Sequence, residues 1–307
     1  MICSSLLIVR PGFAKLAERR GWLWTAGLLA ILSATIYIAA GWPRFSSHPP
    51  TSKANRYVSL SPAITATLVA LGVDSQLVGV SDYCHYPPIV QAIHHVGSGY
   101  TPRYEAIIAL APTLVFIESV NAVSTEPLSH LVRVEPMPWL TLEDVIQSTR
   151  RLGKLTGLVP KSERLANAYE SQLQPRVTPE SPRVLLVMAH LPGEFYEVVF
   201  IRRNSIHGRV LEAAGARNAI GEDVHGAPRL SLEQIIQRDP DAIVILQSAP
   251  QADAGVVDDW RKLTVLRAIQ TNQIRIISAP EVAIPGPQLL ELVQRLASVV
   301  AVWKKTA

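Results

Sequence analysis

The chain has 307 residues, of which 48% are hydrophobic and 18% charged, so it can bury a substantial core and global disorder is excluded. Its formal net charge of +4 is unevenly placed, because residues 1–43 hold four basic residues and one acidic residue. The rest of the chain is nearly neutral, with 25 basic and 24 acidic residues. The overall positive charge therefore gives no support for a nucleic-acid partner.

An uncharged apolar segment spans residues 22–42, with Trp22, Trp24 and Trp42 at its ends. A helix of 21 residues is about 30 Å long, which matches the hydrocarbon core of a membrane, and tryptophan favours the headgroup zone. Basic residues dominate the preceding segment, so residues 1–21 are predicted to be cytoplasmic and the rest to be exported. The segment is interpreted as a transmembrane anchor.

A cleaved signal sequence is the alternative interpretation of residues 22–42, since Ala39, Ala40 and Gly41 offer small residues for cleavage. Lipid attachment at Cys3 is not favoured, because this cysteine precedes the apolar run. Cys84 is the one cysteine of the exported part, so no intramolecular disulfide is expected there and its role stays open.

A short tether at residues 43–55, rich in Pro and Ser, leads into a predicted N-terminal lobe at residues 56–140. Strands are expected at 57–60, 76–80, 113–117 and 131–134. Helices are expected at 62–71, where Pro62 opens the helix and Gly72 stops it, and at 104–110. This alternation is typical of a mostly parallel sheet covered by helices.

Residues 141–178 show no strand pattern and are predicted to be linking helices. Thr141 is a predicted N-cap, with Glu143 and Asp144 in the first turn, and Gly157 breaks the helix. A second helix from Pro160 to about residue 174 would be about 20 Å long, which suits a bridge between two lobes.

A second α/β pattern fills residues 179–307, the predicted C-terminal lobe. Strands are expected at 183–189, 242–246 and 274–278, and helices at 206–214, 232–238 and 288–303. The expected fold is therefore two α/β lobes with mostly parallel sheets flanked by helices, joined by a long bridging helix and preceded by a transmembrane helix.

The two lobes share a repeat with an offset of 128 residues. Glu105 and Glu233 each lie in the first turn of a short predicted helix, and a proline and a buried strand follow each helix. A carboxylate is favoured at a helix start, so both residues could simply be capping acids. Their equivalent places on two lobes also predict a pair of exposed acids on one face.

The chain lacks the sequence signatures of nucleotide-binding and hydrolytic enzymes, with no GxxxxGK[ST], no GxGxxG after a strand and no GxSxG. His94 and His95 are adjacent on a strand and so point to opposite faces, which does not suit one metal ion. No catalytic residue, metal site or cofactor is predicted, and the chain is not expected to be an enzyme.

Tyrosines gather in two loops that follow predicted strands. Tyr83 and Tyr86 flank Cys84 and precede a Pro-Pro pair, and Tyr100 follows a glycine-rich turn. Loops at the carboxyl ends of parallel strands are where α/β proteins bind ligands, although any one of these rings could simply pack a loop onto its own lobe.

Segments 57–88, 96–116, 204–223, 230–246 and 284–297 occur in the order found in a known family. Together they resemble periplasmic substrate-binding proteins of the cobalamin, haem and iron-siderophore ABC importers. The resemblance implies a ligand in the cleft between two lobes joined by one helix. It also implies that Glu105 and Glu233 dock on arginines of the permease, whose ATPase subunits drive import. The implied location is periplasmic, anchored in the inner membrane or released after cleavage.

The resemblance is nearest to the cobalamin-binding members, which implies a corrinoid ligand held by Tyr83, Tyr86 and Tyr100, with Pro62 and Ala63 beside them. Two departures are Glu118 and Ala227, which fall near cleft tryptophans of the family. Arg202 and Arg203 could instead favour an anionic ligand, so haem and ferric siderophores stay open. A periplasmic enzyme or a membrane-tethered sensor on the same scaffold is a further alternative.

Overall fold

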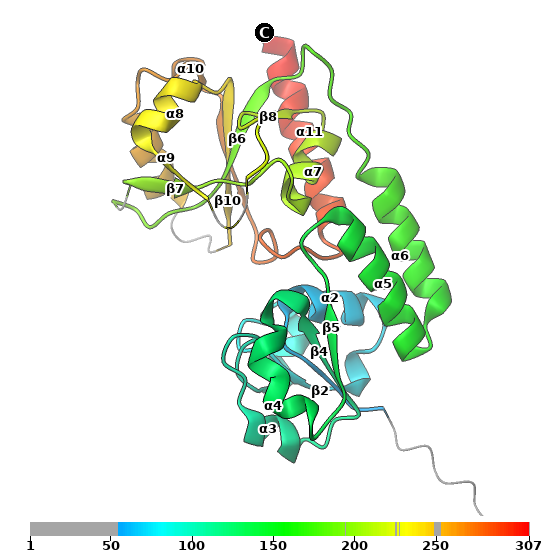
Figure 1. The fold of residues 1–307 in the computed structure, drawn as a ribbon. Coiled ribbons are helices and arrows are strands. Elements are labelled where there is room, and N and C mark those ends of the chain that lie inside the picture. The colour runs from blue at the N-terminus through cyan, green and yellow to red at the C-terminus, as the bar shows by residue number, and fades with distance from the viewer. Residues whose placement is uncertain (1–54, 194, 225, 227, 249–252, 307) are drawn as a thin grey trace, which may run out of the picture. The chain divides into compact units, whose positions relative to one another are not determined.

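The computed structural model describes residues 55–193, 195–224, 226, 228–248 and 253–306 (Figure 1). The predicted cytoplasmic segment, the anchor at 22–42 and nearly all of the tether lie outside the described residues. No helix within the described ranges combines the length and the hydropathy needed to cross a membrane.

The N-terminal lobe (residues 56–140) is built on five parallel strands in the order β3-β2-β1-β4-β5. The strands are β1 (Tyr57–Ser59), β2 (Leu77–Val80), β3 (His94–His95), β4 (Leu114–Glu118) and β5 (Val134–Met137). The helices are α2 (Pro62–Leu71), α3 (Tyr104–Ala109) and α4 (Glu126–Ser129). All strands run one way, so their carboxyl ends share one edge of the sheet, which we call the carboxyl edge of the lobe.

Helix α2 confirms the local signals of its sequence. Ser61 caps it by accepting the backbone N–H of Ile64, and Pro62 occupies the first turn, where its missing N–H costs nothing. Gly72 ends the helix with φ of 87°, a left-handed conformation that glycine adopts without steric penalty.

The last strand of this sheet differs from the prediction. A strand was expected at 131–134, whereas β5 covers Val134–Met137 and pairs with β4 from Val134 onward. Leu131 is 69% exposed in the turn after α4, so its apolar side chain is not a strand position. Pro136 weakens the strand signal in the sequence, yet a proline is tolerated here because β5 lies at the edge of the sheet.

Two helices lead from one lobe to the other: α5 (Leu142–Thr156) and α6 (Val159–Gln172). The predicted capping box between Thr141 and Asp144 is present, and Gly157 ends α5 with φ of 75°. The helices pack closely, since a Cβ atom on Gly153 would lie 2.4 Å from that of Ser162. Helix α5 contacts α2, and α6 contacts α11 (Leu289–Thr306) of the second lobe, so the α5–α6 pair joins the lobes.

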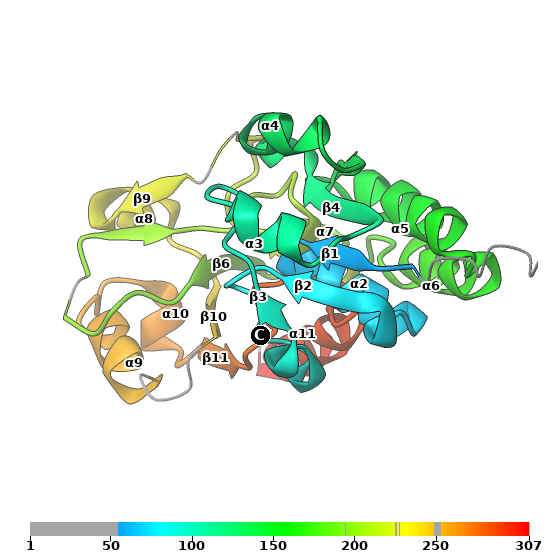
Figure 2. The ribbon, with the colours of Figure 1, turned by 90° about the horizontal axis from the view of Figure 1, so that it is seen from below.

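The C-terminal lobe (residues 179–306) has a parallel sheet in the order β11-β10-β6-β8 and a separate antiparallel pair, β7 with β9 (Figures 1 and 2). The strands are β6 (Arg183–Met188), β7 (Glu197–Val199), β8 (Arg217–Asn218), β9 (Arg229–Ser231), β10 (Ala242–Gln247) and β11 (Ile274–Ser278). The helices are α7 (Ile206–Ala213), α8 (Leu232–Arg238), α9 (Asp253–Arg261), α10 (Arg267–Gln270) and α11 (Leu289–Thr306). The α/β class with parallel sheets flanked by helices is therefore confirmed.

The largest hydrophobic core runs from the first lobe through the linking helices into the second. It contains Phe116 of β4, Tyr169 of α6 and Leu296 of α11, each fully buried. Trp139, which follows β5, donates its indole N–H to the carbonyl oxygen of Pro285, which follows β11, at 2.6 Å. This bond ties the carboxyl edge of one lobe to that of the other.

Candidate functional site

Two exposed tyrosines stand on the carboxyl edge of the N-terminal lobe. Tyr83 follows β2 and is 65% exposed, and Tyr100 follows β3 and is 74% exposed. Large aromatic side chains left in solvent at the ends of parallel strands are typical of a ligand site. The structure therefore gives both rings the accessibility that the predicted ligand contact requires.

Asp82 joins the loops that carry these two tyrosines. Its backbone N–H donates to the carbonyl oxygen of Gly97 at 2.8 Å, and its carboxylate accepts the N–H of Gly97 at 3.2 Å. Arg103 donates to the same carboxylate oxygen at 3.0 Å. Asp82 is thus a positioning residue for both Tyr83 and Tyr100, a role that the sequence did not indicate.

Cys84 lies on the other side of the same loop and is fully buried. Its Sγ is 3.2 Å from the Thr65 hydroxyl of α2, and burial raises the pKa of the thiol to about 11. A protonated thiol in this position fills space and holds the loop on α2, so Cys84 is not a reactive group.

The turn before Tyr100 requires glycine. Gly97 has φ of 90°, and a Cβ atom there would lie 2.5 Å from the carbonyl oxygen of Thr101. The Ser98 hydroxyl accepts the N–H groups of Tyr100 and Thr101 at 3.2 and 3.0 Å. These bonds fix the backbone beneath the Tyr100 ring.

Pro62 and Ala63 begin α2 at the same edge of the sheet. Pro62 is half-buried, whereas Ala63 is only 1% exposed and packs in the main core. Glu118 ends β4 beside them, and its carboxylate accepts the Ser61 hydroxyl at 2.5 Å. Burial raises the pKa of Glu118 above its usual range, and the Ser61 hydrogen bond only partly offsets this.

The carboxyl edge of the C-terminal lobe is organised by a buried acid, Asp259 of α9. Its carboxylate accepts Lys262 Nζ at 2.6 Å, the Gly193 N–H at 2.8 Å and His190 Nε2 at 3.1 Å. Lys262 first, and then Gly193 and His190, lower the pKa of Asp259 to about 2, so it is a carboxylate. The acid therefore holds the loop after β6 against α9.

An aromatic stack extends this arrangement. The His190 ring stacks on Phe195 with centroids 4.7 Å apart, and Phe195 packs on the buried Trp260 at 4.9 Å. Leu191 and Tyr196 of the same loop are 65% and 75% exposed. The sequence gives no sign of this group, since His190 and Asp259 lie 69 residues apart and no spacing rule links them.

Tyr86 differs from the other two predicted tyrosines because it faces the second lobe. It is half-buried, and burial first, then the Glu281 and Glu291 carboxylates, raise its pKa. Arg295 pairs with both acids, at 3.6 Å to Glu281 and 2.6 Å to Glu291. Tyr86 therefore lies beside an ion-pair cluster of the C-terminal lobe.

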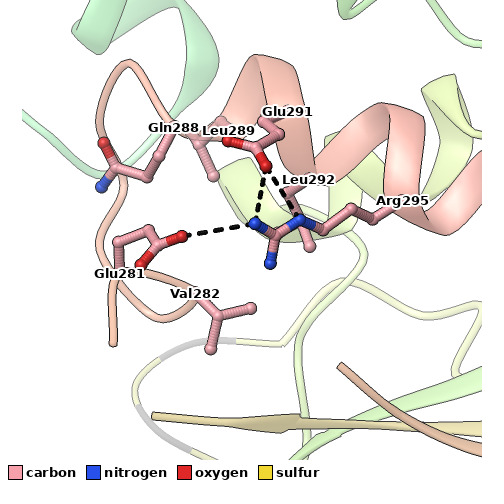
Figure 3. Close-up of a pocket in the computed structure, with 7 residues that line it drawn as sticks. All are labelled: Glu281, Val282, Gln288, Leu289, Glu291, Leu292 and Arg295. Atoms are coloured by element: carbon pink, nitrogen blue, oxygen red, sulfur yellow. Dashed lines mark hydrogen bonds and ion pairs between the residues drawn. The ribbon is translucent and has the colours of Figure 1, made fainter. Parts of the chain in front are cut away.

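This ion-pair cluster lines a pocket at the start of α11 (Figure 3). In the close-up, Glu281 reaches across to the Arg295 guanidinium from the loop before the helix, while Glu291 approaches it from the helix itself. The cavity is about 10 Å³, which is room for one water molecule. It is too small for the predicted ligands.

The two predicted docking acids occupy matching positions. Glu105 lies in the first turn of α3 and Glu233 in the first turn of α8, and both are exposed. The Ser231 hydroxyl and the local backbone lower the pKa of Glu233, which keeps it ionised. Each helix precedes an inner strand of its sheet, β4 or β10. The repeat in the sequence thus corresponds to a repeat in the fold.

The two arginines that suggested an anionic ligand are already engaged. Arg202 donates to the carbonyl oxygen of Val224 at 3.0 Å, and Arg203 pairs with Asp223 at 2.8 Å. Across the described part of the chain, no group of three or more His, Cys, Asp or Glu side chains could hold a metal ion.

A family model described as periplasmic binding protein matches residues 58–280. A vitamin B12-binding protein of Pectobacterium carotovorum is 25% identical over 248 residues, covering 79% of this chain and 87% of the relative. These matches span both lobes and the helices that join them.

Two solved structures have a similar fold. A periplasmic haem-binding protein from Pseudomonas aeruginosa gives a TM-score of 0.67 at 25% identity, covering 80% of this chain and 92% of the other. A periplasmic vitamin B12-binding protein of Vibrio cholerae gives 0.67 at 21% identity, covering 82% and 98%. At 21% identity the second match supports the fold alone.

Proposed function

The chain belongs to the periplasmic binding protein family, a family of binding proteins for transport and not of enzymes, and we propose that it captures a corrinoid for an ABC importer. Membership of this family implies a location outside the cytoplasm. The proposal rests chiefly on one observation: Tyr83 and Tyr100 stand exposed on loops joined by Asp82 at the carboxyl edge of the N-terminal lobe.

Ligand capture would use the carboxyl edges of both lobes. The two tyrosine rings offer flat apolar surface for a planar macrocycle, and Leu191 and Tyr196 offer exposed apolar surface on the C-terminal lobe. Pro62 and the backbone of Ala63 lie at the same edge as Tyr83, and Tyr86 would contribute from the interlobe contact. The vitamin B12-binding relative supports a corrinoid in particular.

A binding titration tests this proposal. Full-length protein, purified in mild detergent, is titrated with cyanocobalamin, hemin and a ferric siderophore by calorimetry and visible absorbance. Saturable binding of cyanocobalamin at one equivalent is expected, and it should weaken in Tyr83→Ala and Tyr100→Ala. Binding of hemin or the siderophore without any corrinoid binding would contradict the proposed ligand.

Haem is the second candidate ligand, favoured by the likeness to the haem-binding protein at 25% identity. A phenol hydroxyl can ligate haem iron, whereas a corrinoid needs only the flat ring. Tyr83→Phe and Tyr100→Phe remove the hydroxyl and keep the ring. For a corrinoid both variants should bind as the unchanged protein does, while loss of binding together with a shifted Soret band would favour haem.

Docking on the permease is proposed for Glu105 and Glu233. Both carboxylates are exposed on equivalent helices, and charge pairs with basic residues of a partner speed and orient association. Glu105→Arg with Glu233→Arg should abolish import in cells while ligand affinity stays unchanged. The matched control is Glu126→Arg with Glu197→Arg, which reverses two other exposed acids, one on each lobe, and should leave import intact.

Membrane tethering is proposed from the apolar segment 22–42 alone. Carbonate extraction of membranes, with N-terminal sequencing of the mature protein, separates the two forms. A retained segment in the membrane fraction is expected, and a soluble mature chain that begins after residue 41 would favour cleavage.

A further inference from the structure

Glu118 is the last residue of β4, an inner strand of the N-terminal sheet. It shares a sheet face with Leu114 and Phe116, both buried in the main core that also packs against α2. Its carboxylate therefore lies at the start of α2, where a chain of hydrogen bonds ends on it. The Ile64 N–H donates to the Ser61 hydroxyl at 3.4 Å, and this hydroxyl donates to Glu118 Oε1 at 2.5 Å.

In the part of the chain that the structure describes, no base balances the charge of Glu118. Within the described residues, the Ser61 hydroxyl is the one group that donates to its carboxylate, so Oε2 is left without a donor there. Burial raises its pKa, and no described cation counteracts this. Glu135 of the same lobe is different, because it is buried and ion-paired with Arg133 and Arg151. A cap for α2 needs only Ser61, so the local fold does not explain a carboxylate at residue 118.

Glu118 also lies close to the proposed aromatic surface. The loop of Tyr100 packs on the segments that follow β1 and β4. Its residue Gly99 is so close to both that an added Cβ atom would lie 3.1 Å from the carbonyl oxygen of Leu60, after β1, and 2.9 Å from Asn121 Nδ2, after β4. The Ser124 hydroxyl, also after β4, donates to the carbonyl oxygen of Gly99 at 2.5 Å. The partly exposed carboxylate is thus within the group of loops that carries the tyrosines.

We infer that Glu118 determines ligand specificity by charge: it accepts N–H donors from a neutral ligand edged with amides and disfavours a ligand edged with carboxylates. This inference rests on the proposed function, because it places the ligand at the carboxyl edge of the N-terminal lobe. It goes beyond that function by naming the residue and the chemical class that it selects.

The chemistry of the two candidate macrocycles differs at their edges. A corrin carries carboxamide groups, which donate N–H, whereas haem carries two propionates. An N–H donated to a carboxylate is a charge-assisted hydrogen bond, about twice as strong as a neutral one. A propionate beside a half-buried, unpaired carboxylate meets like-charge repulsion, which is a means of rejecting the wrong ligand.

The test compares Glu118→Gln with the unchanged full-length protein. Glutamine keeps the size and the acceptor for Ser61 but removes the charge. The control is Glu126→Gln, an exposed acid of α4 in the same lobe. The ligands are cyanocobalamin, hemin, and hemin diamide, in which both propionates are converted to amides. The unchanged protein should prefer hemin diamide to hemin, and Glu118→Gln should reduce that preference by about tenfold, as expected for one charge-assisted bond.

For cyanocobalamin, Glu118→Gln should raise Kd by about tenfold, while Glu126→Gln leaves it unchanged. Glu118→Asp keeps the charge and should keep the preference for the diamide, which separates charge from loss of folding. If hemin and its diamide keep the same ratio of Kd values in Glu118→Gln, the inference is overturned. Absence of corrinoid binding would contradict the proposed function alone, since the comparison of hemin with hemin diamide still tests the role of Glu118. Absence of binding of all three ligands would overturn both.

Discussion

The two lobes present loops at equivalent sheet edges but stabilise them in different ways. In the N-terminal lobe Asp82 and Arg103, each about half exposed, join the loops of Tyr83 and Tyr100. In the C-terminal lobe a buried acid, Asp259, holds the loop of His190 through two hydrogen bonds, from His190 and from the Gly193 N–H, and also accepts Lys262 Nζ at the end of α9. Exposed ion pairs contribute little to stability, whereas a buried carboxylate that loses its partners costs several kcal/mol. The first edge should therefore adapt easily, and the second should be rigid.

The largest effect is expected at Asp259. Asp259→Ala leaves the Gly193 N–H and His190 without their acceptor, and it should lower the free energy of unfolding by about 3 kcal/mol. Denaturant unfolding followed by tryptophan fluorescence measures this. Asp258→Ala removes an adjacent exposed acid that pairs with Arg261 and should change stability by less than about 0.5 kcal/mol. Equal losses in the two variants would contradict a buried clamp in the C-terminal lobe.

A second buried group of the same lobe predicts pH dependence. His207 of α7 is buried with Nε2 3.1 Å from the carbonyl oxygen of Val282, and burial lowers its pKa to about 4. In the unfolded chain a histidine takes up a proton near pH 6.5. The stability contributed by neutral His207 is therefore complete above pH 6.5 and is lost as the pH falls towards 4.

The free energy of unfolding lost through His207 should reach about 3 kcal/mol at pH 4, as follows from the difference between its pKa in the folded and in the unfolded chain. His207→Gln should flatten the decline of unfolding free energy between pH 6.5 and 4. His130→Gln, which changes an exposed histidine of the N-terminal lobe, should keep the decline of the unchanged protein. A decline that is the same in all three proteins would assign the acid sensitivity to other groups.

The smallest effect on stability is expected in the N-terminal lobe, at Asp82. Because Asp82 and Arg103 are each about half exposed, Asp82→Ala should lower the free energy of unfolding by less than about 1 kcal/mol. Its effect should instead appear in ligand binding, since the loops of Tyr83 and Tyr100 would no longer be joined. Parallel denaturation and ligand titration check this, and a loss of stability as large as that of Asp259→Ala would remove the contrast between the lobes.

Local signals in the sequence predicted much of the fold. The helix at Pro62–Leu71 and the strand at Ile274–Ser278 were predicted with their observed bounds, since a cap, a proline, a glycine or a run of β-branched residues marks each. The antiparallel pair β7–β9 and the true position of β5 were missed. The pairing of these strands depends on partner strands that are distant in the sequence. In addition, Pro136 weakens the strand signal of β5, because proline is rare in strands.

The sequence by itself determined the α/β class, the repeat around Glu105 and Glu233, and the loops that carry the tyrosines. Each can be recognised from short-range periodicity or from residue spacing, and neither requires knowledge of the fold. The tertiary structure alone decided which acids have partners: Asp259 meets His190, Tyr86 lies beside the cluster of Glu281, and Glu118 has no basic partner among the residues that the structure describes. These differences depend on contacts between segments tens of residues apart, which burial and packing create and which no local pattern encodes.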